Sequence, residues 1–349
     1  MSELDTILES KKLSGFTGTP EGTSGGKWVQ KLEESFKDYF GTRYAVAMNS
    51  ATSALHASMI ACDIGPGDEV IVTPYSFASS ASCALMVGAT PVFTDITDDT
   101  FNLDPIEIEK NITVNTKAIV VVHLFGHSAD MNAIMKIAND NRLYVIEDAA
   151  QSIGATYDGR RVGTIGDIGV FSFNQSKHIN TGEGGMLITD NELLATKVRA
   201  IRNHGEVSDP TLRMVGYNYR LPEIEAYLAY DQFQGLDREL LERHFTAGEL
   251  ADSLPCWITK PVVKYGIHAW WGYAMRVPEK RDIVLARLQS RGIACDKYVA
   301  PLYHLPIFGE EEPICPVAES MWRGRMLRIH MGDLTKDAIE VIIKTIVAV

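Results

Sequence analysis

Seven short runs of β-branched and other apolar residues recur along the first 190 positions. They are separated by longer stretches, such as 53–64 and 131–141, with apolar residues at helical spacing. The runs cover 44–50, 69–75, 90–96, 117–126, 143–150, 168–173 and 185–190. Nearly all are continuously apolar, which is typical of strands buried on both faces of a sheet. The pattern predicts βα alternation and an α/β domain with a largely parallel, seven-stranded sheet.

The pattern changes after residue 220. Residues 220–254 keep helical periodicity, with Gly235 near the middle, and predict a long, interrupted helix. A smaller α+β unit follows, with strands near 270–277 and 326–331 and a helix at 281–292. The first 26 residues are rich in Gly, Ser and Thr and predict an arm or loop. We therefore expect an N-terminal arm (1–26), a large domain (27–235) and a small C-terminal domain (236–349).

Composition and charge narrow the class of protein. The 349 residues are 46% hydrophobic and 22% charged, as in an ordinary globular protein of about two domains. The net charge of −12 repels a phosphate backbone, so no nucleic-acid partner is expected. No apolar run approaches about 18 residues, and the N-terminus lacks the order of a signal peptide. The five cysteines are scattered, never in CxxC spacing. A cytoplasmic protein without a membrane partner is expected.

Candidate chemistry follows the strands, because open parallel sheets bind ligands beyond their carboxyl ends. Ser50, Ala51 and Thr52 come directly after the first strand and open a helix, where free amides favour an anion such as a phosphate. Simple N-capping by Ser50 is the alternative interpretation. Neither GxxxxGK[ST] nor, after the first strand, GxGxxG is present, so this is not a nucleotide loop of either kind.

Asp148 and Gln151 follow the run at 143–150. A carboxylate at the end of a buried strand is suited to hydrogen-bond a protonated ring nitrogen. The same spacing is equally that of a capping box, with Asp148 at N-cap and Gln151 at N3.

Lys177 lies between a buried strand and a Gly-rich turn, within the segment 171–185. Enclosure of this kind desolvates an amine, lowers its pKa and makes it nucleophilic, as Schiff-base chemistry requires. A solvated loop lysine is the alternative. A phosphate site, an acid for a ring nitrogen and an imine-forming lysine are together the parts that pyridoxal phosphate (PLP) needs.

The sequence then resembles the DegT/StrS sugar-nucleotide aminotransferases. The motifs that carry the resemblance lie, in order, at 67–81, 145–155, 169–187, 201–205, 216–229, 298–308 and 315–319. The resemblance extends from about Val29 to the C-terminus, and the segment around Lys177 is its most diagnostic part. It implies the PLP-dependent transferase fold of type I, the cofactor pyridoxal 5'-phosphate, a homodimer with active sites at the interface, and a role in amino-sugar and polysaccharide biosynthesis.

The resemblance also implies roles for cofactor-binding residues. Lys177 matches the Schiff-base lysine and proton shuttle. Asp148 matches the partner of the pyridine nitrogen, and Gln151 a contact on the hydroxyl side of the ring. Phe77 matches the aromatic residue that stacks on the ring. The phosphate is expected near Ser50, Ala51, Thr52 and Ser172.

Other matched residues concern the substrate and the second subunit. Asn218 matches a residue that reaches the phosphate of the neighbouring subunit's cofactor. Gly25, Gly26, Lys27 and His304 lie where the family contacts the sugar nucleotide. Two features depart from the family. Ala51 stands where a glycine is common, which keeps the backbone amide, and the segment 19–28 is atypical where selectivity is set.

Several histidines and tryptophans are further candidates for chemistry or for the core. His123 and His127 are four apart, but no HExxH glutamate is present and no metal site is expected. His178 follows Lys177. In the family's dehydratase branch a histidine replaces the lysine itself, so the filled lysine position favours transamination. The adjacent tryptophans, residues 270 and 271, are interpreted as small-domain core.

The resulting hypothesis is a PLP-dependent aminotransferase. It converts a nucleotide-linked keto sugar, expected to be a 4-keto-6-deoxy sugar, with glutamate as amino donor. The alternatives are a PLP-dependent nucleotide-sugar dehydratase, a 3-keto sugar aminotransferase and, less favoured, a non-catalytic regulatory homologue. An NAD-dependent epimerase or dehydrogenase would need the missing dinucleotide fingerprint. The carrier stays open among UDP, dTDP and GDP.

Overall fold

The seven predicted runs form one sheet. The computed structural model describes residues 3–17, 20–207, 211, 213–309, 315–332 and 334–349. The strand order is β1-β9-β8-β5-β4-β2-β3, and β9 alone within this sheet runs against its neighbours. The strands are β1 (Tyr44–Met48), β2 (Glu69–Val72), β3 (Thr90–Phe93), β4 (Thr116–Val122), β5 (Tyr144–Asp148), β8 (Ile168–Ser172) and β9 (Gly185–Thr189). The mostly parallel sheet is therefore confirmed.

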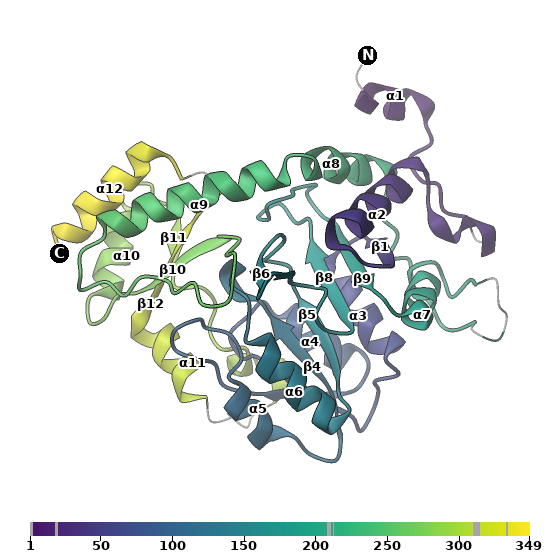
Figure 1. Cartoon of the computed structure of the whole chain (residues 1–349), viewed down its shortest axis with the longest axis horizontal. Helices are drawn as coiled ribbons and strands as arrows, with labels where there is room; N and C mark the ends of the chain where they lie inside the picture. The colour runs from purple at the N-terminus through teal and green to yellow at the C-terminus, as the bar shows by residue number, and fades with distance from the viewer. Residues whose placement is uncertain (1–2, 18–19, 208–210, 212, 310–314, 333) are drawn as a thin grey trace.

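Helices cover both faces of this sheet (Figure 1). One face packs against α3 (Ala51–Ala61), α4 (Ser79–Met86) and α7 (Glu192–Arg202). The other packs against α2 (Lys27–Phe40), α5 (Pro105–Asn111), α6 (Met131–Asn141) and α8 (Glu223–Phe233). Because successive strand residues point to opposite faces, both faces must be apolar, which explains the continuous apolar runs.

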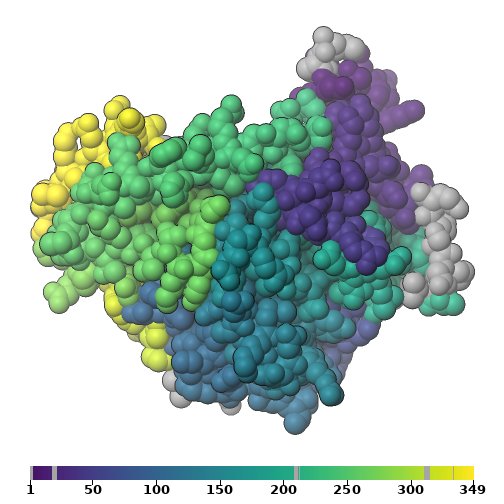
Figure 2. Space-filling model, in the orientation of Figure 1, coloured from purple at the N-terminus to yellow at the C-terminus, as the bar shows by residue number. Residues whose placement is uncertain are grey.

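The predicted long helix is two helices. Gly235 separates α8 from α9 (Leu236–Ser253), and α9 leads from the large domain to the small one (Figure 1). The small domain holds an antiparallel sheet of order β10-β12-β11. Its elements are β10 (Gly272–Arg276), α10 (Arg281–Gln289), β11 (Cys295–Asp296), β12 (Met326–His330) and α12 (Lys336–Val347). The green-to-yellow small domain packs against one side of the large domain (Figure 2).

Shorter elements complete the described chain. They are η1 (Pro20–Ser24), η2 (Leu124–Gly126), β6 (Thr156–Tyr157), β7 (Arg160–Arg161), η4 (Leu302–His304), η5 (Pro306–Phe308), α11 (Pro316–Ser320) and η6 (Met321–Arg325). None of the helices in the described ranges combines the length and apolarity that crossing a membrane requires. The predicted limits of the arm and the two domains stay a prediction.

The N-terminal segment is more ordered than its composition indicates. It begins with α1 (Glu3–Ser10), and Ile7 and Phe16 are buried in the same apolar cluster as residues of α2 and α8. Arg202 Nη2 donates to the carbonyl of Thr23 at 2.7 Å and holds the segment to the body. Two apolar side chains anchor this segment, too few to register as a core element in the sequence pattern.

A tight contact joins the two domains at Gly126. Its φ is +100°, its carbonyl accepts the amide of Ala269 at 2.8 Å, and a Cβ placed there would lie 2.7 Å from the amide nitrogen of Trp270. Gly159 also has a positive φ, +80°, but a Cβ there meets nothing within 4 Å. Alanine at position 159 would therefore introduce backbone strain alone, whereas alanine at position 126 would add a steric overlap.

We expect Gly126→Ala to destabilise the protein more than Gly159→Ala. Both substitutions lower the free energy of unfolding by about 1–2 kcal/mol, because alanine is strained at a positive φ. Gly126→Ala lowers it by about 1–3 kcal/mol more, because the added methyl group overpacks the contact. Urea titration of the two variants and the wild type measures the free energy of unfolding. Equal losses in the two variants would contradict a tight domain contact at Gly126.

Candidate active site

A cavity of about 1070 Å³ opens between the sheet of the large domain and the small domain. Its walls include residues at the carboxyl ends of β2, β4, β5 and β8 and residues of α9, β11 and β12. The predicted residues that line it are Ser50, Ala51, Thr52, Phe77, Asp148, Gln151, Ser172 and Lys177. The structure thus brings together every cofactor-binding candidate except Asn218.

The N-terminus of α3 faces this cavity. Ser50 Oγ accepts the amide of Ser53 at 3.0 Å, so Ser50 is the N-cap, as the simpler interpretation has it. Within the described chain, the amides of Ala51 and Thr52 donate no hydrogen bond. Free amides and the positive end of the helix dipole suit this terminus to an anion.

Asp148 is a buried carboxylate at the end of β5. Ser80 Oγ donates to its Oδ2 at 2.7 Å, and the amide of Ala150 donates to its Oδ1 at 3.1 Å. No helix begins after Asp148 in this described part of the chain, so the capping-box interpretation is wrong. Gln151 Oε1 accepts the amide of Phe125 at 2.9 Å, and its Nε2 donates to the hydroxyl of Tyr298 at 2.9 Å. Both carbonyl and amino groups of Gln151 are therefore fixed.

Lys177 lies in the turn between β8 and β9. The pKa of its amine is lowered to about 8, chiefly by burial, while Asp148 opposes the shift and the charge of Arg328 adds to it. The Nζ atom lies 4.4 Å from the ring centroid of Trp271. Among the described residues no carboxylate is within ion-pairing distance of this amine. The predicted lowering of the pKa of Lys177 is confirmed in direction.

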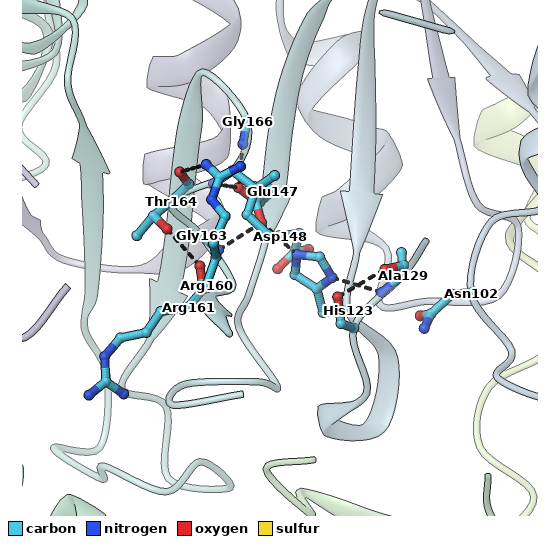
Figure 3. Close-up of polar contacts among 12 residues, drawn as sticks. Asn102, His123, Ala129, Glu147, Asp148, Arg160, Arg161, Gly163, Thr164 and Gly166 are labelled. Atoms are coloured by element: carbon cyan, nitrogen blue, oxygen red, sulfur yellow. Dashed lines mark hydrogen bonds and ion pairs between the residues drawn. The ribbon is translucent and has the colours of Figure 1, made fainter. Parts of the chain in front are cut away.

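A second buried carboxylate, Glu147, precedes Asp148 in β5 (Figure 3). His123 Nδ1 accepts the amide of Ala129 at 3.1 Å, so the ring proton is on Nε2, which donates to Glu147 Oε2 at 2.9 Å. Burial alone would raise the pKa of Glu147, but His123 and several backbone amides hold it below its usual value. The donating amides belong to Gly163, Ile165 and Gly166. This carboxylate fixes the loop after β7 against β5.

The histidines singled out in the sequence have structural partners. Both nitrogens of His127 are engaged, since Nδ1 donates to the carbonyl of Ser128 at 2.7 Å and Nε2 accepts the amide of Lys264 at 3.1 Å. His178 lines the cavity, and its Nε2 donates to the carbonyl of Ala269 at 2.7 Å. Burial lowers the pKa of His178 to about 3, so the ring is neutral.

The remaining candidates lie outside the cavity of this single chain. Asn218 is exposed and bridges to Asn203. Gly25, Gly26 and Lys27 lie where α2 begins, and Glu223 accepts the amide of Trp28 at 3.0 Å there. His304, in η4, pairs with Glu319. One subunit alone does not bring these five residues to Lys177.

Several residues of the small domain line the cavity without having been predicted. Trp270 is small-domain core as predicted, but Trp271 lines the cavity, and its indole N–H donates to the carbonyl of Ser176 at 2.7 Å. Tyr298 lies against Trp271, with ring centroids 6.3 Å apart, and burial raises its pKa to about 12. Of these small-domain residues, Arg328 could have been noticed in the sequence, because it is a charged residue within the apolar run at 326–331.

Comparisons with known proteins agree with this geometry. A profile described as the DegT/DnrJ/EryC1/StrS aminotransferase family matches residues 9–347. The chain is 40% identical to the GDP-perosamine synthase of Caulobacter vibrioides, over 87% of this chain and 83% of that protein. It is 38% identical to the UDP-N-acetyl-3-dehydro-alpha-D-glucosamine 3-aminotransferase of Acidithiobacillus ferrooxidans, over 85% of this chain and 81% of that protein.

A solved structure matches over nearly the whole chain. It is DesV of S. venezuelae in complex with a ketimine intermediate, with a TM-score of 0.90 and 32% identity. The match covers 98% of this chain and 92% of DesV.

We expect Lys177 to titrate near pH 8 in the ligand-free protein. The rate of its acetylation, followed by peptide mass spectrometry from about pH 6 to about pH 11, gives the pKa. Arg328→Met removes a neighbouring positive charge and raises this pKa, whereas Asp148→Asn removes a negative charge and lowers it further. An apparent pKa near that of a free lysine, unchanged in both variants, would contradict the enclosed amine.

Proposed function

Because the chain belongs to the DegT/DnrJ/EryC1/StrS aminotransferase family, we propose that it transfers an amino group from glutamate to a nucleotide-linked 4-keto-6-deoxy sugar. The chain is a sugar aminotransferase, and its cofactor is pyridoxal 5'-phosphate. The observation that carries the proposal is the position of Lys177, an amine with a lowered pKa that shares one cavity with Asp148.

The residues of the cavity fit this cofactor. The free amides of Ala51 and Thr52 suit its phosphate, with the hydroxyl of Ser172 on the same wall. Phe77 is 63% exposed although it is aromatic, and it lines the cavity, as a stacking partner for the ring would. Tyr298 accepts from Gln151, which leaves the tyrosine's own proton for a further acceptor. When bound, the cofactor would supply an electron-accepting ring and an aldehyde carbon that condenses with amines.

The protein residues then have separate tasks. Lys177 would hold the cofactor through its Nζ, and when free this amine would take a proton from the substrate carbon and return it. A pKa of about 8 leaves part of this amine neutral near pH 7, as a base must be. The carboxylate of Asp148 would hold a proton on the ring nitrogen, and the hydrogen bond from Ser80 keeps that carboxylate in place.

The outlying candidates are explained by a homodimer with active sites at the interface. Asn218 is exposed in the single chain, which leaves it accessible to a second copy whose cofactor phosphate it would contact. We assign Gly25, Gly26, Lys27 and His304 to the sugar nucleotide. Lys27 has an exposed side chain, and its Nζ lies 3.7 Å from Glu3 Oε2, an exposed ion pair that a sugar nucleotide would replace. The cytoplasmic location stays a prediction.

A 3-keto sugar is the second candidate substrate, because a relative of 38% identity is named a 3-aminotransferase. A dehydratase is less favoured, because the lysine position is filled by Lys177 and His178 is engaged with the backbone.

A panel of 4-keto and 3-keto sugars linked to UDP, dTDP or GDP tests the function. With PLP and glutamate, at least one member is expected to show the mass change from oxo to amino. Lys177→Ala should lose at least about 100-fold in rate because the proton-transfer group is gone. Lys136→Ala, an exposed lysine of α6, is the matched control and should keep the wild-type rate. Absence of amination for every sugar would defeat the proposed function.

A further inference from the structure

A buried arginine of the connecting helix α9 reaches the cavity. Arg243 is only 7% exposed and lines the cavity together with Glu239. Its Nε donates to Glu239 Oε1 at 2.7 Å, and its Nη1 donates to the carbonyl of Trp270 at 3.1 Å. No hydrogen bond from Nη2 is found within the described residues. The guanidinium is therefore held on one side and keeps a donor for a ligand on the other.

His178 supplies a buried acceptor that the fold leaves unused. Its Nε2 donates to the carbonyl of Ala269 at 2.7 Å, so Nδ1 carries a lone pair. The pKa of this ring is lowered chiefly by burial and then by the charge of Arg243, so the ring stays neutral. Nδ1 is buried and has no hydrogen-bond partner among the described residues. Because an unpaired buried acceptor is costly, a ligand that donates to Nδ1 would be stabilised.

One short segment, residues 269–271, ties both groups to the surroundings of Lys177. His178 donates to the carbonyl of its first residue, and Arg243 donates to the carbonyl of its second. The indole of its third residue lies against Lys177, with Nζ 4.4 Å from the ring centroid. His178 also follows Lys177 directly in the chain. A ligand that reacts at Lys177 therefore has these two groups close by.

A glycine borders the space beside Nη2 of Arg243. A Cβ placed at Gly332 would lie 3.6 Å from this nitrogen, in ordinary van der Waals contact. The same glycine lines the cavity, and its φ is outside the left-handed region. The lack of a side chain at Gly332 thus keeps this donor accessible, and an alanine there would fill the space without straining the backbone.

This set of groups favours a neutral ligand that both donates and accepts. Glu239 balances the charge of Arg243, and His178 Nδ1 can only accept. An ionised carboxylate only accepts, so it would leave Nδ1 unpaired and face the charge of Glu239. A hydroxyl accepts from Arg243 and donates to His178 at the same time. The keto sugar carries hydroxyls on its ring, whereas the side chain of glutamate carries none.

We propose that Arg243 and His178 together bind one ring hydroxyl of the keto sugar and select for sugars that carry it. This inference rests on the proposed function and names the part of the sugar that the cavity recognises. A 4-keto-6-deoxyhexose has free hydroxyls at C2 and C3, so one of these two is the group that is bound.

Amination of the keto sugar and of analogues that lack its C2 or its C3 hydroxyl tests the assignment. Protein loaded with pyridoxamine phosphate is mixed with each sugar, and the rate of product formation is read by mass. We expect the wild type to aminate one analogue about 10-fold to 100-fold more slowly than the parent sugar. Arg243→Met should slow the parent sugar by a similar factor and leave that analogue unchanged, because both changes remove the same hydrogen bond.

A second variant keeps the test independent of the stability of Arg243→Met. Gly332→Ala leaves every polar group in place and puts a methyl group beside Nη2, so it should slow the parent sugar more than the analogue. Its matched control is Gly248→Ala, at an exposed glycine of α9 where a Cβ meets nothing within 4 Å. Arg238→Met, at an exposed arginine of α9 that does not line the cavity, is the control for Arg243→Met. Both controls should behave as wild type.

A binding measurement reports on the same contact without amination. Calorimetric titration uses 6-deoxyhexoses linked to UDP, dTDP or GDP, which have a hydroxyl in place of the keto group and cannot be aminated. Arg243→Met is expected to bind the preferred one about 10-fold to 100-fold more weakly than the wild type.

The outcomes separate this inference from the proposed function. In Arg243→Met, an unchanged rate with the parent sugar, or equal losses with the parent and both analogues, would overturn the hydroxyl contact. A loss confined to the half-reaction with glutamate, or with glutamine, whose amide also donates and accepts, would overturn it too, since the pair would then bind the amino donor. If the wild type aminates no sugar, the proposed function fails. The titration still decides on Arg243, and an unchanged affinity in Arg243→Met refutes the contact.

Discussion

The amine of Lys177 is enclosed where the sheet of the large domain meets the small domain. An ammonium group loses solvation there, and within the described chain no carboxylate pairs with it. The strand end at Asp148 forms one wall of its surroundings, and Trp271 and Arg328 form the other. Because neither domain encloses the amine alone, the reactivity of Lys177 depends on how the two domains pack, including the contact at Gly126.

Two adjacent carboxylates in β5 show how one strand serves both structure and chemistry. Successive side chains point to opposite faces, so Glu147 and Asp148 meet different surroundings. Glu147 accepts hydrogen bonds from His123 and from three loop amides, so its role is structural. Asp148 has fewer donors and lines the cavity. A buried carboxylate with four donors thereby stabilises the strand that presents Asp148.

The sequence predicted the large domain well, because strands buried on both faces are continuously apolar. The place of Lys177 at the edge of the sheet was also predictable, since it lies between a buried strand and a Gly-rich turn, but its full enclosure also needs the small domain. Arg328 and Trp271 were not, because they reach the cavity through the fold of a distant small domain. The strand Cys295–Asp296 is too short for a periodic signal. The role expected of Asn218 requires a second subunit, and the sequence pattern of one chain does not say where that subunit would lie.

We propose above all that the cofactor is covalently bound to Lys177. Borohydride reduction of the PLP-loaded protein, followed by peptide mapping, tests it most directly. We predict one reduced cofactor adduct, located on the peptide that contains Lys177. Treatment with glutamate before the reduction should abolish this adduct. An adduct on another lysine, or no adduct in protein that has bound the cofactor, would contradict this account.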